Sequence, residues 1–215
     1  MKILFVAMAQ SVHVARWINQ IADQGWDLHL FPSQDVGLHH TSLRNITIHH
    51  SISTPSQAPV SKAANRRVTG LRVPSLPFNQ AYTSTRIATY ARAAQETFGL
   101  GKRAKTLARL IARLQPDLLH TIEFQHGGYL TLAAQEYFGR HFPGRFPPWI
   151  ITNYGHDLYL YRHLKAHRER LQQLLSRVDY YTCECQRDLN IAGRWGYRVR
   201  PGQFCPTLAA LTWPS

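Results

Sequence analysis

Lys2-Ile-Leu-Phe-Val-Ala-Met8 is a short, almost unbroken apolar run, and it decides the class of fold. Such a run is typical of a strand buried on both faces in the middle of a parallel sheet. After the polar turn Ala9-Gln-Ser-Val-His13, apolar residues recur at helical spacing up to Gly25, which suits the left-handed end of a helix. Trp26-Asp-Leu-His-Leu-Phe31 then alternates as a second strand. The stretch Met1–Phe31 therefore predicts a β-α-β unit with a right-handed crossover.

Strand and helix patterns alternate along the rest of the chain. We expect strands at 45–49, 118–122, 149–153 and 179–183, and helices at 82–98, 102–115, 129–138, 157–177 and 184–195. This alternation predicts an α/β fold with a doubly wound, mainly parallel sheet and helices on both faces. The length of 215 residues fits a single domain, 1–215.

Two parts of the first half lack a clear pattern. The segment 51–80 is rich in Pro, Ser and Arg, and we expect a surface loop there. Paired histidines stand at 39–40 and 49–50, beside the short apolar run 45–49. Because no acidic or thiol partner stands at ligand spacing, these pairs indicate a solvated loop rather than a metal site.

The composition narrows the partners and the compartment. The formal net charge is +13, which favours anionic partners such as nucleotide phosphates, nucleic acid or anionic lipid. Three cysteines are too few for a disulfide scaffold, and Cys183 and Cys185 without further ligands indicate a structural role. With no leader or long apolar span in the sequence, we expect a cytoplasmic protein, with peripheral contact at the inner face of a membrane as one option.

A basic stripe on the helix expected at 102–115 supports that membrane option. Its apolar positions face one side, and the other side carries four cations: Lys102, Lys105, Arg109 and Arg113. A stripe of this kind is either a surface for anionic lipid or only the solvated side of a packed helix, and both interpretations stay open.

Four of the loops that follow the expected strands carry polar clusters. Because parallel strands end at one edge of a sheet, these clusters should form one cleft suited to a polyol or a phosphate. Two adjacent glycines would also let backbone amides approach a ligand. The candidate binding residues are Gln10, Ser11, His13 and Arg16; Glu123, Gln125, His126, Gly127 and Gly128; Asn153, Gly155, His156 and Asp157; and Glu184 and Arg187. No catalytic residue and no metal ligand is assigned.

Several of these polar residues also have a structural explanation. Asp157 and Glu184 precede expected helices, where a carboxylate caps the helix or meets its positive end. Arg16 and Arg187 would pair with surface carboxylates. His120, inside an apolar strand, is expected to be a hydrogen-bonded core histidine rather than a base.

Familiar nucleotide-binding loops are absent from the sequence. Neither Gly-x-Gly-x-x-Gly after the first strand nor Gly-x-x-x-x-Gly-Lys-Ser/Thr occurs, which argues against a dehydrogenase and a P-loop enzyme. A small hydrolase using His126 or His156 would lack a nucleophile elbow. A basic module that binds anionic membrane or nucleic acid without catalysis is the alternative, although scattered charges disfavour nucleic acid.

In order and spacing, several motifs resemble the N-terminal half of family 4 glycosyltransferases. They are Lys2-Ile-Leu-Phe-Val6, Ser11-Val-His-Val-Ala-Arg-Trp17, Pro116-Asp-Leu-Leu-His120, Glu123-Phe-Gln-His-Gly-Gly-Tyr-Leu130, Asn153-Tyr-Gly-His-Asp157 and Cys183-Glu-Cys-Gln-Arg-Asp188. The resemblance covers most of the chain outside 32–80. It implies a Rossmann-like half of a GT-B fold that forms the acceptor side of a cleft.

The same resemblance implies a reaction. It is retaining transfer of a sugar from a nucleotide-sugar donor to a sugar or lipid-linked acceptor, with no metal or other cofactor. The donor would be held mainly by a C-terminal domain, which we expect to be absent from this sequence, or by a partner chain.

Two departures limit what the resemblance implies for single residues. Similar sequences carry Trp-Gly-Ser-Asp where this one has Tyr154, Gly155, His156 and Asp157, so a contact through that serine is not carried over. Ile122 stands where many members have a histidine near the donor sugar.

Overall fold

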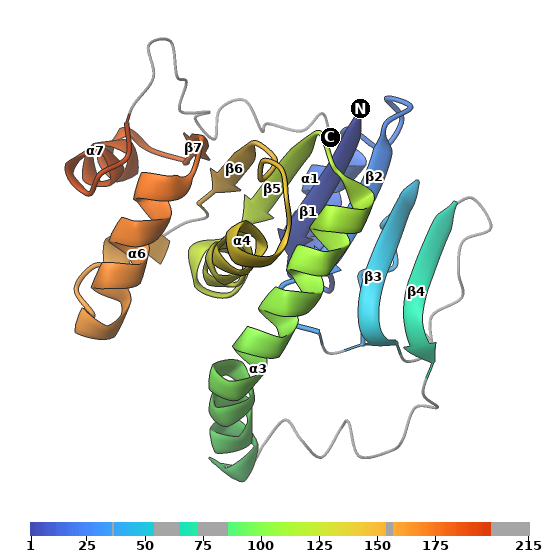
Figure 1. The fold of residues 1–215 in the computed structure, drawn as a ribbon, viewed down its shortest axis with the longest axis horizontal. Helices are drawn as coiled ribbons and strands as arrows, with labels where there is room; N and C mark the ends of the chain where they lie inside the picture. Colours follow the sequence, from blue (N-terminus) through green and yellow to red (C-terminus); the bar gives the residue numbers. More distant parts are fainter. Residues whose placement is uncertain (36, 54–64, 73–85, 154–156, 199–215) are drawn as a thin grey trace, which may run out of the picture.

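One parallel sheet forms the centre of the protein (Figure 1). The computed structural model describes residues 1–35, 37–53, 65–72, 86–153 and 157–198. Seven strands pair in the order β4-β3-β2-β1-β5-β6-β7, and every neighbouring pair is parallel. The strands are β1 (Lys2–Ala7), β2 (Asp27–Pro32), β3 (Ile46–Ser53), β4 (Arg66–Arg72), β5 (Leu118–Ile122), β6 (Trp149–Thr152) and β7 (Tyr180–Thr182). The predicted α/β class and the parallel sheet are confirmed.

Helices cover both faces of the sheet, with α3 and α4 in front and α1 behind in the view of Figure 1. They are α1 (Val12–Asn19), α3 (Arg86–Leu114), the π-helix η1 (Phe124–Gly128), α4 (Tyr129–His141), α5 (Asp157–Tyr161), α6 (Lys165–Arg177) and α7 (Gln186–Arg194). Alternate residues of β1 enter two separate hydrophobic clusters, so this strand is buried on both faces, as its apolar run predicts.

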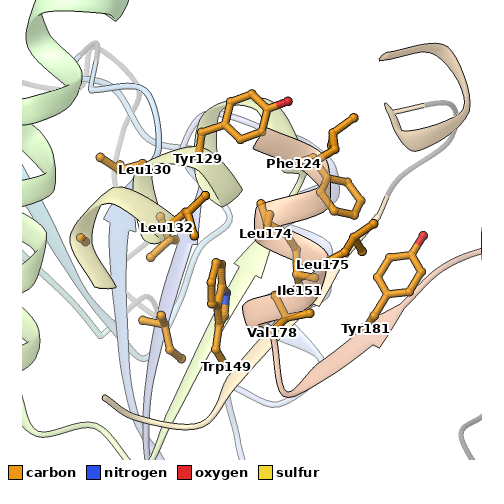
Figure 2. Packing of buried hydrophobic residues seen from close by; sticks show 14 of the residues in the cluster. Phe124, Tyr129, Leu130, Leu132, Trp149, Ile151, Leu174, Leu175, Val178 and Tyr181 are labelled. Carbon is orange, nitrogen blue, oxygen red and sulfur yellow. The ribbon is translucent and has the colours of Figure 1, made fainter. Parts of the chain in front are cut away.

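The larger cluster lies between the sheet and helices α3, α4, α6 and α7. Figure 2 shows Trp149 of β6 at its base, below Leu132 of α4 and beside Leu174 of α6. Trp149 is fully buried, and its indole N–H donates to Thr121 Oγ1 at 2.8 Å. A buried aromatic ring with its polar atom satisfied stabilises the fold by about 1.5–3 kcal/mol.

The smaller cluster lies between α1 and strands β1 to β3. Val14 and Ile18 of α1 are buried there, and Ser11 begins the helix by accepting a hydrogen bond from the Val14 amide at 3.5 Å. The helix ends at Asn19, earlier than the apolar spacing predicts, and turns lead to Gly25. Gly25 has a φ of +68°, the left-handed conformation expected of it.

One sequence expectation for the first half of the sheet is wrong, because strand β4 occupies part of the segment 51–80, where a loop is expected. The strand expected at 45–49 is present as β3, which extends to Ser53. Strand β4 reads Arg-Arg-Val-Thr-Gly-Leu-Arg. It lies at the edge of the sheet, where one side has no strand to pair with and charged residues are tolerated, so it carries no apolar run.

Helix α3 is continuous where the sequence predicts two helices. The expected break falls at the glycines around Gly101, which has open space where a Cβ would be. A glycine inside a helix costs about 1 kcal/mol relative to alanine, and the buried face of Leu107 and Ile111 offsets that cost. Conversely, the expected helix 157–177 is divided into α5 and α6.

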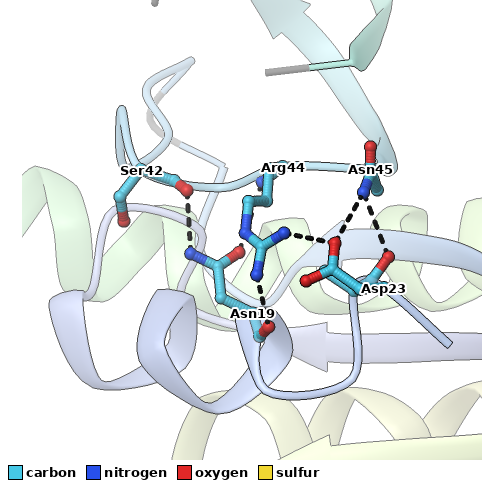
Figure 3. A network of polar contacts seen from close by, with 6 residues as sticks. Asn19, Asp23, Ser42, Arg44 and Asn45 are labelled. Atoms are coloured by element: carbon cyan, nitrogen blue, oxygen red, sulfur yellow. Dashed lines mark hydrogen bonds and ion pairs between the residues drawn. The ribbon is translucent and has the colours of Figure 1, made fainter. Parts of the chain in front are cut away.

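A polar network fixes the connection between β2 and β3 (Figure 3). Asn19, at the end of α1, donates to the Ser42 carbonyl at 2.8 Å and accepts from the Arg44 amide at 3.3 Å. Arg44 also pairs with Asp23, which lowers the pKa of Asp23 and raises that of Arg44. Asn45 donates to the Ala22 carbonyl at 3.1 Å. The β2–β3 connection is therefore anchored to α1 although it contains no helix.

Candidate functional site

The carboxyl ends of the parallel strands form the edge where the sequence predicts a cleft. Gln10 follows β1, Glu123 follows β5, Asn153 follows β6 and Glu184 follows β7. These residues lie at one edge, as expected, and their part in binding stays a prediction. His13 and Arg16 are exposed on α1. Asp157 is the first residue of α5, and Gly155 and His156 lie outside the described residues.

The turn after β5 is the centre of this edge. Glu123 is buried and has a φ of +79°, which costs a non-glycine residue about 1–3 kcal/mol and is concentrated at functional sites. Its Oε1 accepts from Ser33 Oγ at 3.0 Å, and Gln34 Nε2 lies 2.9 Å from His126 Nε2. The turn after β5 is thus tied to the end of β2, which lies beyond β1 in the sheet.

Two glycines let η1 lie directly on the sheet. A Cβ on Gly127 would stand 2.9 Å from the Val6 carbonyl oxygen, and one on Gly128 would stand 2.6 Å from Leu174 Cδ1. The Gly128 amide donates to the Glu123 carbonyl at 3.0 Å. The expectation that this amide approaches a ligand is therefore wrong, because it serves the turn itself, and both glycines are needed for close packing.

At β6 and β7 the edge is built from an amide and a carboxylate. Asn153 is 1% exposed and donates to Asp188 Oδ2 at 3.1 Å. Arg187 donates to Asp188 Oδ1 at 2.9 Å and lies over the ring of Tyr159, 4.2 Å from its centroid. The hydrogen bond to Asp188 raises the pKa of Arg187. Arg187 therefore pairs with a carboxylate, as one of its interpretations predicts, although Asp188 is buried rather than at the surface.

Three side-chain amides at this edge each have a buried atom without a hydrogen-bond partner among the described residues. These atoms are Gln10 Oε1, Gln125 Nε2 and Asn153 Oδ1, on the turns after β1, β5 and β6. Each such atom costs about 1–3 kcal/mol when it is left without a partner, and buried polar groups in proteins are almost always satisfied. Because the three atoms lie at the same edge of the sheet, we infer that a polar ligand or ordered water forms the missing hydrogen bonds.

Helix α3 contributes an arginine that sequence reasoning missed. Arg103 donates to the Ser33 carbonyl at 2.9 Å and to the Pro32 carbonyl, and it lies over the ring of Phe31. Burial lowers the pKa of Arg103. Arg103 is not one of the four cations of the basic stripe, and only the fold shows that it reaches the end of β2.

The basic stripe of Lys102, Lys105, Arg109 and Arg113 is exposed. By contrast, Leu107 and Ile111 are buried in the larger cluster. The apolar side of α3 therefore packs on the core, as the apolar side of a packed helix does. Within the described residues, no helix is long and apolar enough to cross a membrane.

His120 is a core histidine, as predicted. It is 8% exposed in β5, and its Nε2 lies 2.7 Å from Thr152 Oγ1. Burial lowers the pKa of His120 to about 4. The ring is accordingly neutral at neutral pH and carries no charge toward the edge of the sheet.

The expectation of a solvated loop for the paired histidines is wrong for two of them. His49 and His50 lie in β3, and His50 is buried.

A hollow of about 530 Å³ opens at the opposite edge of the sheet, beside Asp23, Asp27 and Asn45. In the part of the chain that the structure describes, no three His, Cys, Asp or Glu residues are grouped to hold a metal ion.

Comparison with protein families identifies the family of the chain. The glycosyl transferase 4-like family matches residues 2–71 and 75–184. The chain belongs to that family. The match includes most of the region 32–80 that the motif resemblance leaves out, and it covers the turns after β1, β5 and β6 and Glu184 after β7. A search among curated proteins finds no match. The edge described above is thus the edge of a glycosyltransferase domain.

Proposed function

We propose that this glycosyltransferase domain contributes the acceptor side of the cleft in which a sugar is transferred from a nucleotide-sugar. The proposal depends on the three unsatisfied polar atoms of Gln10, Gln125 and Asn153. They comprise two acceptor oxygens and one donor nitrogen, which matches a hydroxyl group because a hydroxyl both donates and accepts. A sugar or polyol presents several such groups at once.

The proposed transfer keeps the anomeric configuration, as the resemblance implies. The bond between the sugar C1 and the leaving phosphate oxygen breaks, and the acceptor oxygen bonds to C1 on the same face. The hydroxyl proton moves to the departing phosphate. The transition state resembles an oxocarbenium ion, so positioned hydrogen bonds and charges are its main stabilisation.

In this scheme, residues of the domain bind and orient the acceptor. Gln125 and Asn153 hold hydroxyl groups, and buried Glu123 fixes the turn that carries Gln125. The donor nucleotide is held mainly by residues outside this chain, in a further domain or a partner chain. With a lipid-linked acceptor, the exposed basic side of α3 would face anionic lipid at the inner membrane surface.

Gln125→Ala tests the proposal, because the side-chain amide nitrogen has no partner among the described residues and its removal costs the fold little. We expect methyl α-glucoside to shift the amide resonances of Gln10 and Asn153 in the 215-residue chain. Gln125→Ala should weaken that binding roughly 2- to 10-fold, the value of one hydrogen bond. Gln173→Ala, at an exposed position of α6, is the matched control and should bind as the wild type does.

Calorimetry with UDP-glucose and GDP-mannose tests the division of labour. We expect weak or undetectable donor binding to the chain alone. Tight donor binding, or glycoside-induced shifts confined to the hollow near Asp23 and Asn45, would show that the acceptor assignment is wrong.

A further inference from the structure

Three side chains form a hydrogen-bonded chain between the β2–β3 connection and β3. Asp35 Oδ1 lies 2.7 Å from His50 Nδ1, and His50 Nε2 lies 3.3 Å from His39 Nδ1. The His50 side chain is fully buried and that of Asp35 is 9% exposed. Water is therefore kept from these contacts, which strengthens them and holds the rings in place.

This chain belongs to the edge that carries the candidate site. The backbone amide of His40 donates to the Ala9 carbonyl at 2.7 Å, so His39 is placed beside the turn that carries Gln10. At the other end, Asp35 follows Gln34, whose amide contacts His126. The hydrogen-bonded chain thus runs along the same polar edge.

The carboxylate sets the direction of every hydrogen in the chain. An ionised carboxylate only accepts, so His50 carries its hydrogen on Nδ1. In a neutral imidazole the other nitrogen is then an acceptor, so His50 Nε2 accepts from Nδ1–H of His39. Nε2 of His39 is left with a lone pair, and no hydrogen bond to it is present among the described residues.

The surroundings of His39 keep its ring neutral. Burial first, then the charge of Arg66 on β4, and then repulsion from His50 on β3 whenever that ring also carries a proton, lower the pKa of His39 to about 4. The negative group facing this pair is Asp35, through His50. At neutral pH His39 therefore offers an acceptor nitrogen and no positive charge.

We propose that His39 is a hydroxyl-binding residue of this edge: its Nε2 accepts a hydrogen bond from a sugar or polyol hydroxyl. Asp35 and His50 are positioning residues that fix the accepting form of the ring. The identity of the ligand rests on the proposed acceptor site, whereas the direction of the hydrogens does not. The oxygens of a phosphodiester carry no hydrogen to donate, so this position selects hydroxyl groups over phosphodiesters.

Nitrogen-15 spectra of the histidine side chains of the 215-residue chain test the direction of the hydrogens. We expect His39 in the Nδ1–H form in the wild type. In Asp35→Asn the amide can donate as well as accept, so the chain can reverse and His39 should move toward the Nε2–H form. Asp27→Asn is the matched control: Asp27 lies 3.0 Å from a different histidine, His29, and its replacement should leave His39 unchanged. An Nε2–H form of His39 in the wild type, including one forced by a doubly protonated His50, overturns the proposal.

Titration with methyl α-glucoside and with dimethyl phosphate, a phosphodiester without a hydroxyl group, tests the ligand. The glycoside should shift the His39 Nε2 resonance in the wild type, dimethyl phosphate should not, and Asp35→Asn should weaken glycoside binding roughly 2- to 10-fold. Shifts at Gln125 that leave His39 unchanged overturn this inference and leave the proposed function standing. If no resonance of the edge shifts with the glycoside, the acceptor site itself fails, and this inference fails with it.

Discussion

The close packing of η1 on the sheet gives a quantitative prediction for Gly127→Ala. The added Cβ would lie 2.9 Å from the Val6 carbonyl oxygen and 3.0 Å from both the Ile122 carbonyl oxygen and Thr121 Cγ2. Ordinary contacts begin at 3.4 Å, so the groups must separate by about 0.5 Å. Val6 and Ile122 belong to central strands held on both sides by other strands, so η1 has to move instead.

Overpacking of this kind costs about 1–3 kcal/mol. In a domain of this size each kcal/mol lowers the melting temperature by roughly 2–4 °C. Urea unfolding followed by tryptophan fluorescence measures the free energy of unfolding. We expect a lower urea midpoint at an unchanged slope, together with shifted amide resonances around Glu123.

Gly139→Ala is the matched control for this substitution. Gly139 is exposed in α4, and a Cβ there meets nothing within 4 Å. Because alanine is the better helix former, this variant should gain about 0.5–1 kcal/mol. A loss of stability in Gly127→Ala together with a gain in Gly139→Ala would separate the packing effect from a general effect of alanine. A Gly127→Ala protein that unfolds at the wild-type urea midpoint would refute the packing explanation.

Two further predictions concern buried polar groups. The pKa of His120 is about 4 in the fold and 6.5 when unfolded, so the unfolded chain binds the proton more readily and the free energy of unfolding falls as pH decreases through this window. His120→Gln should reduce the pH dependence of the free energy of unfolding by up to about 1.4 kcal/mol per pH unit. Urea unfolding at pH values of about 7 and about 5 measures this dependence. An unchanged dependence would contradict the assignment of the lowered pKa to His120. Arg103→Ala leaves the carbonyls of Pro32 and Ser33 without their donor and should cost about 1–3 kcal/mol, whereas exposed Arg109→Ala on the same helix should cost less than about 0.5 kcal/mol. Equal losses in the two arginine variants would refute the role of Arg103.

The interior strands can be predicted from the sequence because their burial is visible locally, and β7 at one edge is predicted as well. Strands β1, β5 and β6 lie in the interior of the sheet, and their apolar runs reflect burial on both faces. Strand β4 lies at an edge, and its pattern of arginine, threonine and glycine does not indicate burial on either face. The unbroken α3 was missed because tertiary packing outweighs the local cost of its glycines.

The candidate site was predictable in its place but not in its contacts. A parallel sheet brings its carboxyl ends together, which is enough to place Gln10, Glu123 and Asn153 at one edge. The chain from Asp35 through His50 to His39 depends on how the loop 33–45 folds back beside β3, which no local pattern encodes. The positive φ at Glu123 could not be predicted either, because the sequence has a glutamate where such a backbone conformation favours glycine.

The positive charge of the chain would by itself suggest a phosphate site at this edge, and the contacts of its arginines argue against that interpretation. The Arg103 guanidinium is bound to the carbonyls that end β2, and Arg187 is bound to buried Asp188. Beside His39, Arg66 donates to the Thr41 carbonyl at 3.0 Å. A guanidinium already paired in this way offers fewer free N–H groups to a phosphate. Besides Nε of Arg103, three of the unsatisfied buried groups at this edge are neutral amides, and His39 adds a neutral imidazole, so the edge is chemically suited to the hydroxyl groups of an acceptor.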